Sequence, residues 1–500
     1  MKKIFTLLLV AMTAVVARAT DYIVPVTVVV NDVTSEQLGE FSIVENDGLY
    51  DVNLKNFILD SENGPMGVGN VELKGIQPYL DGKATLFVTE KEVTITDGDD
   101  PNVVVWMASM LPPVNVLLRG KIEGDLLYMN LYIDLMETMG QIIQVTVGEG
   151  YQMPNPSFEL WHPSDETHVE PDGWHSFETA TGALAAFGGH HLTKSKNAHS
   201  GEACARIYSS SILGIVANGT MTTGRLNADA MSATDPANNA YLDTSMPDLD
   251  GAGKPFYIPL YSRPDSIAVW VKYRHGSIDP DHPYANISAV ITDGTYYQDP
   301  EDKVYTNVVA KAKNDKIATT DGEWVRVTAP FVYTENAVEP KAILVTISTN
   351  ADAGKGGDGD EVLVDDIELI YNAKVTGLKI NGQDMPGFSP DVFEYEMELE
   401  QGVTTEDIEV VVEGQSTHVI KDVSFIDSNV CTVMALGGDM KHMSTYVIRE
   451  KGSGTGIRSI KTPAGQSAYY TLDGRQAKTL APGRIYIRRQ ADGTVTKVRL

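Results

Sequence analysis

Two stretches of the sequence place a tryptophan on the polar side of a predicted β-strand. In residues 267–274 and 324–329, apolar side chains alternate with polar ones, and each tryptophan belongs to the polar set. A ring exposed in this way stacks on the apolar face of a sugar while neighbouring polar groups hydrogen-bond its hydroxyls. The two stretches therefore predict a glycan-binding surface. Its candidate residues are Trp270, Trp324, Lys272, Arg274 and Arg326.

The same alternation has a second interpretation, in which both rings cover a further hydrophobic layer beneath loops. Tyr296 and Tyr297 are weaker candidates for a stacking role. Trp161 and Trp174 lie near turn residues, so we expect them to plug an end of the fold. The pattern alone leaves the two interpretations open.

No catalytic set is recognisable. The sequence has no Gly-x-Ser-x-Gly elbow, phosphate-binding loop or dinucleotide fingerprint. A glycosidase needs two carboxylates about 5 to 10 Å apart, but none of the 68 acidic residues stands in a recognisable context. Binding without catalysis is therefore favoured. A polysaccharide-active enzyme on the same scaffold and a structural or adhesive surface protein are the alternatives.

Histidines gather in one part of the chain. Six of the ten lie between residues 162 and 199, namely His162, His168, His175, His190, His191 and His199. They lack the spacing on a single helix or strand, and the cysteines, that are typical of zinc sites. We interpret them as surface-loop residues.

The charge of the chain is strongly negative and unevenly distributed. Its formal net charge is −29, which excludes nucleic acid and anionic membranes as favoured partners. Residues 456–500 hold nine Lys+Arg and two Asp+Glu, so this tail carries 9 − 2 = +7. A basic tail on an acidic body indicates a separate module.

The first residues have the three parts of a signal peptide. Met1-Lys2-Lys3 is followed by an apolar run over residues 4–16 and then by Ala17-Arg18-Ala19. We expect a signal peptide over residues 1–19 and export to the medium or cell surface, with the periplasm as an alternative. No later run reaches about eighteen apolar residues, so no transmembrane segment is expected. Cys204 and Cys431 fall in different predicted domains and are interpreted as buried core residues rather than a disulfide.

Residues 20–150 alternate with the period of half-buried strands. In residues 126–135, for example, Leu127 and Met129 share one face and Tyr128 and Asn130 share the other. The order of the segments 52–57, 66–71 and 117–122 resembles calycin-like barrel domains of exported Bacteroidetes proteins. That resemblance implies a β-barrel that either holds one small apolar ligand or is packed solid.

Residues 151–372 open with Asn155-Pro156-Ser157-Phe158-Glu159 and close with Asp365-Asp366-Ile367-Glu368-Leu369. With Pro171-Asp172-Gly173-Trp174 added, the segment resembles jelly-roll carbohydrate-binding modules and a carbohydrate-metabolism domain of exported Bacteroidetes proteins. The resemblance implies glycan as the partner and a structural calcium ion near the joined terminal strands. The implied calcium ligands are Glu159 and Asp366, with Asp365 as a substitute and Asp358 and Asp360 as further contributors. Strands are predicted over residues 267–273, 285–291, 324–331 and 342–348, and residues 218–250 are predicted to be an excursion outside the core.

Two smaller units complete the predicted all-β chain. Residues 373–452 resemble immunoglobulin-like or cadherin-like sandwich repeats through Val375-Thr376-Gly377-Leu378-Lys379-Ile380 and a strand whose core residues are predicted to be Phe393, Tyr395, Met397 and Leu399. Residues 453–500 begin with a Gly/Ser linker. Tyr470-Thr471-Leu472-Asp473-Gly474-Arg475 and Gly483-Arg484-Ile485-Tyr486-Ile487 then resemble the C-terminal sorting domain of the type nine secretion pathway. This resemblance implies secretion machinery as a partner.

Overall fold

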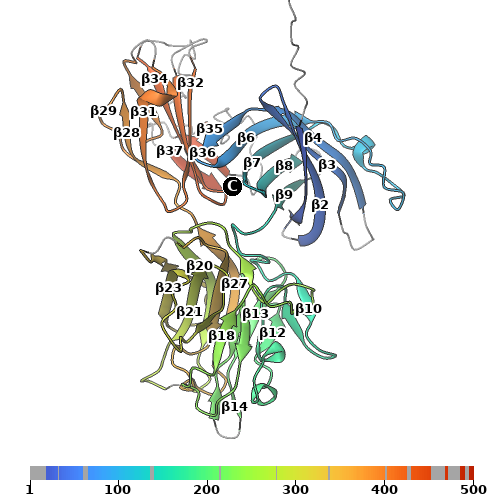
Figure 1. Cartoon of the computed structure of the whole chain (residues 1–500), viewed down its shortest axis with the longest axis vertical. Helices are drawn as coiled ribbons and strands as arrows, with labels where there is room; N and C mark the ends of the chain where they lie inside the picture. Colours follow the sequence, from blue (N-terminus) through green and yellow to red (C-terminus); the bar gives the residue numbers. More distant parts are fainter. Residues whose placement is uncertain are drawn as a thin grey trace, which may run out of the picture.

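A computed structural model of the chain describes residues 18–31, 33–59, 66–135, 140–212, 215–277, 279–335, 338–399, 403–424, 430–451, 468–470, 485–489 and 495–499. Their regular structure is β-strand apart from four short 3-10 helices, and none of it is α-helix, which confirms the predicted all-β class (Figure 1). The 3-10 helices are η1 (Ala108–Met110), η2 (Phe177–Thr179), η3 (Ala185–Phe187) and η4 (Thr405–Asp407). No helix in the described part of the chain is long and apolar enough to cross a bilayer.

The N-terminal unit is a nine-stranded antiparallel sheet that curves into a barrel (Figure 1). Its strands are β1 (Arg18–Val30), β2 (Val33–Asn46), β3 (Leu49–Leu59), β4 (Met66–Ile76), β5 (Pro78–Asp81), β6 (Ala84–Val93), β7 (Val114–Glu123), β8 (Leu126–Leu135) and β9 (Gln141–Val147). The strand order is β4-β3-β2-β1-β9-β8-β7-β6-β5, and only Gln77 separates β4 from β5. Because β4 and β5 stand at opposite ends of this order but are consecutive in the chain, the sheet curves so that its two edges come together at Gln77, although no backbone pairing joins these edges among the described strands. The predicted signal peptide lies outside the described residues except for Arg18 and Ala19, which begin β1, so it stays a prediction.

The inside of this barrel is filled by apolar side chains. Leu127, Met129, Leu131, Ile133 and Leu135 of β8 are all buried there, as the alternation predicts. A cavity of about 20 Å³ is left between apolar residues of β2, β3, β4, β8 and β9. A space of this size holds about one water molecule. This cavity is therefore much smaller than a ligand pocket, which usually has a volume of a few hundred Å³.

The central unit is a sandwich of two antiparallel sheets (Figure 1). One sheet has the order β12 (Leu192–Ser195), β13 (Cys204–Tyr208), β27 (Glu361–Ile370), β20 (Ser266–Arg274) and β24 (Val325–Pro330). The other has the order β16 (Thr220–Thr222), β26 (Ala342–Ser348), β21 (Ala285–Thr292), β23 (Val308–Ile317) and β25 (Val332–Tyr333), with β19 (Ile258–Pro259) beside β26. Along the chain β13, β16, β20 and β21 alternate between the two sheets, and β24, β26 and β27 do so again, which is the path of a jelly roll.

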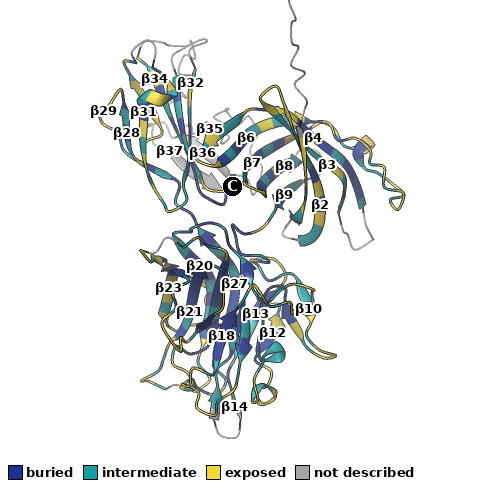
Figure 2. Ribbon diagram, viewed as in Figure 1, coloured by how far each residue is buried: buried dark blue, intermediate teal, exposed yellow. Residues whose placement is uncertain are grey.

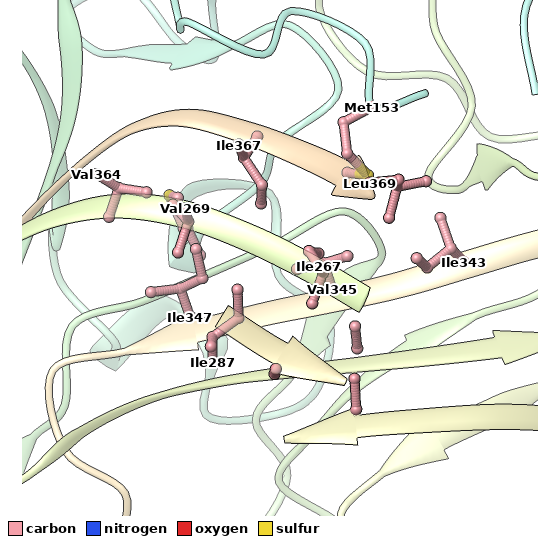
Figure 3. Close-up of a cluster of buried hydrophobic side chains, with 14 of the residues drawn as sticks. Met153, Ile267, Val269, Ile287, Ile343, Val345, Ile347, Val364, Ile367 and Leu369 are labelled. Carbon is pink, nitrogen blue, oxygen red and sulfur yellow. The ribbon is translucent and has the colours of Figure 1, made fainter. Parts of the chain in front are cut away.

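The core of the sandwich lies between these sheets. Figure 3 shows Val269 and Val364 from β20 and β27 facing Ile287 and Ile347 from β21 and β26. Each such side chain is buried, and burying it fully contributes about 1.5–3 kcal/mol. Figure 2 shows the same concentration of buried residues along the strands of this sandwich. The core fixes which face of β20 and β27 points outward.

Residues 218–250 do not form an excursion outside the core, so that prediction was wrong. They supply β16 to one sheet and then form β17 (Arg225–Asn227) and β18 (Asn239–Leu242), which pair with β22 (Tyr297–Asp299) in a third sheet. Leu226 and Leu242 pack with Val290 and Leu344 on the outer side of the sandwich. Each strand is only three or four residues long, so the many polar residues between the strands obscured the alternation of their apolar positions.

Two further hairpins pair β10 (Trp161–Pro163) with β11 (Val169–Pro171) and β14 (Ser210–Ile212) with β15 (Ile215–Ala217).

The third unit is a smaller sandwich. Its sheets have the orders β29 (Gln383–Asp384), β28 (Lys374–Ile380), β31 (Ile408–Glu413) and β30 (Glu394–Met397), β34 (Met443–Glu450), β33 (Val430–Leu436), β32 (His418–Ser424). Tyr395, Met397 and Leu399 pack on its core as predicted. Phe393 is 46% exposed, contrary to the prediction: it precedes β30, and its ring centre lies 5.3 Å from that of Tyr446. Beyond this unit, β35 (Ala468–Tyr470), β36 (Ile485–Arg489) and β37 (Val495–Arg499) form a three-stranded sheet, and much of the sorting-domain motif lies outside the described residues.

The three units meet at a buried junction. The outer face of the barrel contributes Leu86 and Tyr128, the start of the central unit contributes Tyr151, and the third unit contributes Ile420 and Leu436. The Tyr128 and Tyr151 rings are 4.6 Å apart, and both residues are only 1% exposed. Tyr128 lies on the face of β8 that alternation assigns to solvent, and it is buried because another unit covers it.

Polar groups at this junction are paired across the units. Asp439 of the third unit accepts hydrogen bonds from the Gln152 side-chain amide at 3.0 Å and from His442 at 3.2 Å. On the barrel side, the Lys121 ammonium lies 3.1 Å from Nε2 of His418, whose Nδ1 lies 2.9 Å from Asp81. We call these six residues the junction network: Asp81, Lys121, Gln152, His418, Asp439 and His442. Its members come from all three units, so they couple the orientation of one unit to the next.

Candidate functional site

The outer face of the five-stranded sheet carries the five predicted glycan-binding residues. Ile267, Val269, Val271 and Tyr273 of β20 are buried in the core, whereas Trp270 and Lys272 are half-buried and Arg274 is exposed. Arg326 of β24 is directly opposite Trp270, and directly opposite residues point to the same side of a sheet. The Lys272 ammonium lies 5.3 Å from the centre of the Trp324 ring. All five residues therefore lie together, which is the arrangement that alternation predicts; their role in binding stays a prediction.

A β-bulge in β27 positions the acidic residues of this face. Ala268 pairs with Glu368 and Trp270 pairs with Asp365, so Val269 stands opposite two residues of β27. Asp366 has a φ of 44° at this point, in the left-handed region. The extra residue shifts the alternation, so that Glu361, Asp365 and Glu368 all point to the outer face. Bulges re-aim side chains in this way.

The three arginines of the face are already paired with carboxylates, whereas the Lys272 ammonium faces the Asn197 side-chain oxygen and the Trp324 ring. Glu361 accepts hydrogen bonds from Arg206 and, at 2.8 Å, from Arg274. Burial raises the pKa of Glu361, but the hydrogen bonds from Arg274 and Arg206 outweigh it and the net shift is downward. Arg326 bonds Glu368 in the same way. The face is thus polar and nearly balanced in charge rather than a bare basic patch.

His199 is a member of this face that the sequence prediction missed. Its ring stacks on Trp270 with centroids 3.9 Å apart and an interplanar angle of 16°. It also meets the edge of Trp324 at 5.8 Å. One side of the Trp270 ring is therefore covered, and a sugar would stack on what is left exposed of the two tryptophans. The sequence offered only the nearness of several histidines, because His199 comes from a loop and not from either tryptophan strand.

The residues predicted to bind calcium hold the loop that carries His199. Asp365 is fully buried and accepts hydrogen bonds from the backbone N–H groups of His199 at 2.7 Å and Ser200 at 3.2 Å. Asp366 accepts from the Ser200 hydroxyl and lies 2.6 Å from Nδ1 of His199. Glu159 accepts from the N–H groups of residues 202 and 203. Burial and the neighbouring Asp366 charge raise the pKa of Asp365 to about 7.

These carboxylates do not present the oxygens that a calcium site needs. Calcium takes six to eight oxygen ligands, whereas the oxygens of Glu159 and Asp365 face N–H donors. Asp360 likewise accepts from the N–H groups of residues 276 and 357, and Asp358 accepts from that of residue 211. This arrangement does not fit a calcium ion. Calcium binding stays a prediction, and it would require these carboxylates to release the backbone N–H groups of the loop that carries His199.

Other sequence candidates have different outcomes. Tyr297 is buried at 1% exposure and cannot stack on a ligand, whereas Tyr296 is 39% exposed and packs on Tyr241. Trp174 is buried in the sandwich core and Trp161 packs at its edge, as expected for residues that plug the fold. Three of the six histidines are not surface residues, so that prediction was wrong for His162, His175 and His191. Burial of each ring is tolerated because a ring nitrogen has a polar partner. For example, Nδ1 of His175 lies 2.8 Å from the carbonyl oxygen of Gly224.

Both cysteines are buried and free, as predicted. Cys204 belongs to β13 of the central unit and Cys431 to β33 of the third.

Comparisons with known proteins give only distant similarity. The sequence matches no protein-family model and no curated protein. Among solved structures, the chain is similar to a candidate glycoside hydrolase from Bacteroides thetaiotaomicron, with 16% identity, a TM-score of 0.34, and coverage of 61% of this chain and 96% of the other. It is also similar to a structure from a study of carbohydrate-binding modules of the β-sandwich superfamily, with 11% identity, a TM-score of 0.21, and coverage of 66% and 97%. Similarity at this level assigns neither a ligand nor an activity, so the function has to be argued from the site.

Proposed function

We propose that the central unit binds a glycan on the outer face of its five-stranded sheet. The observation that carries this proposal is the pairing of two half-buried tryptophans, Trp270 and Trp324, with hydrogen-bonding side chains on one sheet face. Aromatic faces supply the stacking surface, and the paired Arg and Glu side chains together with Lys272 supply donors and acceptors for hydroxyls. Export, which the leader predicts, would place this surface where glycans occur.

The charge balance of the face favours a neutral glycan. Arg206 and Arg274 share Glu361, and Arg326 is paired with Glu368. A sulfated or uronic-acid polymer would have to displace Glu361 and Glu368 from these arginines, and the existing ion pairs would be lost. A neutral sugar keeps them and bonds their remaining donors and acceptors.

Binding is favoured over hydrolysis because the carboxylates of this face are engaged. Asp365 is enclosed by N–H donors, and Glu361 and Glu368 are held by arginines. A glycosidase needs an acid and a second carboxylate that both reach the scissile bond. Hydrolysis on this scaffold is therefore the second candidate.

Replacing Trp270 or Trp324 with alanine is expected to weaken glycan binding about 5- to 150-fold, the equivalent of roughly 1–3 kcal/mol for an interface aromatic. The glycan is first identified by screening the whole chain on an array with neutral, sulfated and uronic-acid members, and affinities are then measured by calorimetry. The matched control is Trp161→Ala, since Trp161 is also half-buried but packs against the core. Loss of a fully buried tryptophan would cost about 3–5 kcal/mol of stability. Drops of that size in the melting temperature of both variants, or unchanged affinity, would contradict the proposal.

A separate assay decides between binding and hydrolysis. The purified protein is expected to release no reducing ends from plant, algal or host polysaccharides. Sustained turnover that a single Asp→Ala or Glu→Ala substitution abolishes would establish the enzyme instead. Absence of binding to every array member would favour a structural or adhesive role.

A further inference from the structure

Two histidines and a glutamate, none of them a member of the tryptophan face, converge on the surface of the central unit. His168 lies just before β11, Glu178 lies in η2, and His190 follows η3. One ligand atom from each of the three lies within 4.8 Å of the others, the one such group in the part of the chain that the structure describes. Nδ1 of His168 is 3.9 Å from Glu178, and Nδ1 of His190 contacts the other oxygen of the same carboxylate. Asp165 adds a second carboxylate, 2.7 Å from Nδ1 of His168.

The backbone segments that carry these side chains are fixed by buried polar contacts. Glu170 is fully buried and accepts hydrogen bonds of 2.6 Å from both the N–H and the hydroxyl of Ser176, the residue that caps η2. This contact joins the strand that follows His168 to the helix that carries Glu178. His191 is also buried, and its two ring nitrogens lie against the carbonyl oxygens of Tyr208, at 2.7 Å, and of Gly188. The residue next to it, His190, is therefore held at a fixed place while its own side chain stays exposed.

We propose that His168, Glu178 and His190 bind a transition-metal ion of the zinc class, with Asp165 or water as the fourth ligand. Imidazole and carboxylate are ligands that zinc, copper and nickel accept, and four-coordinate sites suit zinc. Calcium and magnesium prefer sets made only of oxygen ligands. The two imidazole rings now stack at 3.4 Å, so they must turn apart to aim their lone pairs at one ion. Their partial exposure leaves room for that rotation.

The alternative is that the cluster binds no metal and that its two imidazoles simply share one carboxylate. Such a cluster would bind zinc no better than any other surface histidine with an acidic neighbour. His282 provides that comparison, because its Nδ1 lies 2.7 Å from Asp352 and it is also half-buried. The cluster and this pair therefore differ in the number of converging ligands and not in the kind of residue.

The test uses the whole chain after removal of metal with a chelator. Zinc ion alone is added, binding is followed by calorimetry and thermal melting, and bound zinc is counted by elemental analysis after gel filtration. We expect one zinc per chain and a rise in melting temperature, with weaker binding at acidic pH because ligating imidazoles must be neutral. His190→Ala is expected to raise the zinc Kd at least tenfold, and Glu178→Gln tests the carboxylate with little change of shape. His282→Ala is expected to leave both the Kd and the stoichiometry unchanged.

Three results would overturn the proposal. One is a wild-type stoichiometry near zero. The second is an unchanged Kd in a His168→Ala/His190→Ala double variant that melts normally. The third is calcium binding as tight as zinc binding in the wild-type protein. Glycan affinity is measured on the same samples, and it should not depend on zinc, because the tryptophan face uses none of these residues.

Discussion

Replacing Asp439 with alanine is expected to lower the free energy of unfolding by roughly 3 kcal/mol. The Asp439 carboxylate is fully buried and accepts hydrogen bonds from Gln152, His442 and the N–H group of Lys441. Hydrogen bonds to a charged group contribute about 1.5–3 kcal/mol each, and they do not add because they share one carboxylate. Alanine leaves the Gln152 amide and the Lys441 N–H without this acceptor inside the junction. Urea unfolding followed by circular dichroism measures the loss, and X-ray scattering shows whether the units separate.

The matched control for this substitution is Asp391→Ala. Asp391 is also an ion-paired aspartate of the third unit, but its side chain is 80% exposed beside Lys374. An exposed pair of this kind contributes about 0–1 kcal/mol. Equal losses in the two variants would show that the junction network does not hold the units together.

The loss caused by Asp439→Ala should also depend on pH. The hydrogen bond that His442 donates to Asp439 raises the pKa of His442, so the stability that this histidine gains is present below pH 6.5 and is lost as pH rises through its folded pKa. Burial raises the pKa of Asp439, but the hydrogen bond and charge of His442 outweigh it and lower the pKa overall. That stability is lost as pH falls through the lowered pKa. The variant should therefore differ most from wild type at mildly acidic pH.

Alternation of apolar and polar residues predicts which side of a strand is buried. The structure agrees with this prediction for strands that pack one side on the core of their own unit. The core side of β20 and the core side of β8 both follow from period-two patterning alone. The same patterning separated Trp270 from Val269 and Val271, so one face of the candidate site could be anticipated.

What alternation cannot show is what covers the other side. Tyr128 is buried because Tyr151 of the central unit and apolar residues of the third unit, far along the chain, pack over this side of the barrel. His199 reaches Trp270 from a loop that Asp365 holds, and the bulge at Asp366 that aims Asp365 has no signature in period-two patterning. These contacts join residues far apart in sequence, so neither local propensity nor spacing indicates them.

Titration of Lys121 should change the stability of the junction at alkaline pH. Its side chain is almost fully buried between the barrel and the third unit, with the ammonium 4.1 Å from the Tyr151 ring centre and 3.1 Å from His418. Burial lowers the pKa of Lys121 from 10.5 to about 8, although Glu123 and Asp439 oppose this shift. Below pH 8 the lysine is charged in both the folded and unfolded states. Between pH 8 and 10.5 the folded state binds fewer protons than the unfolded state, so stability should rise with pH over this window.

Lys121→Met removes this titration and keeps a side chain of similar length. The stability of the wild type relative to the Lys121→Met variant is therefore expected to increase by about 3 kcal/mol between pH 8 and 10.5, because one pKa unit corresponds to about 1.4 kcal/mol. Parallel urea titrations at several pH values measure the difference, in which the other titrating groups cancel. Lys83→Met, in the exposed turn between β5 and β6, is the control and should follow the wild type at every pH. A Lys121→Met curve parallel to the wild-type curve would show that the ammonium is hydrated, and that the barrel and the third unit are not tightly packed around it.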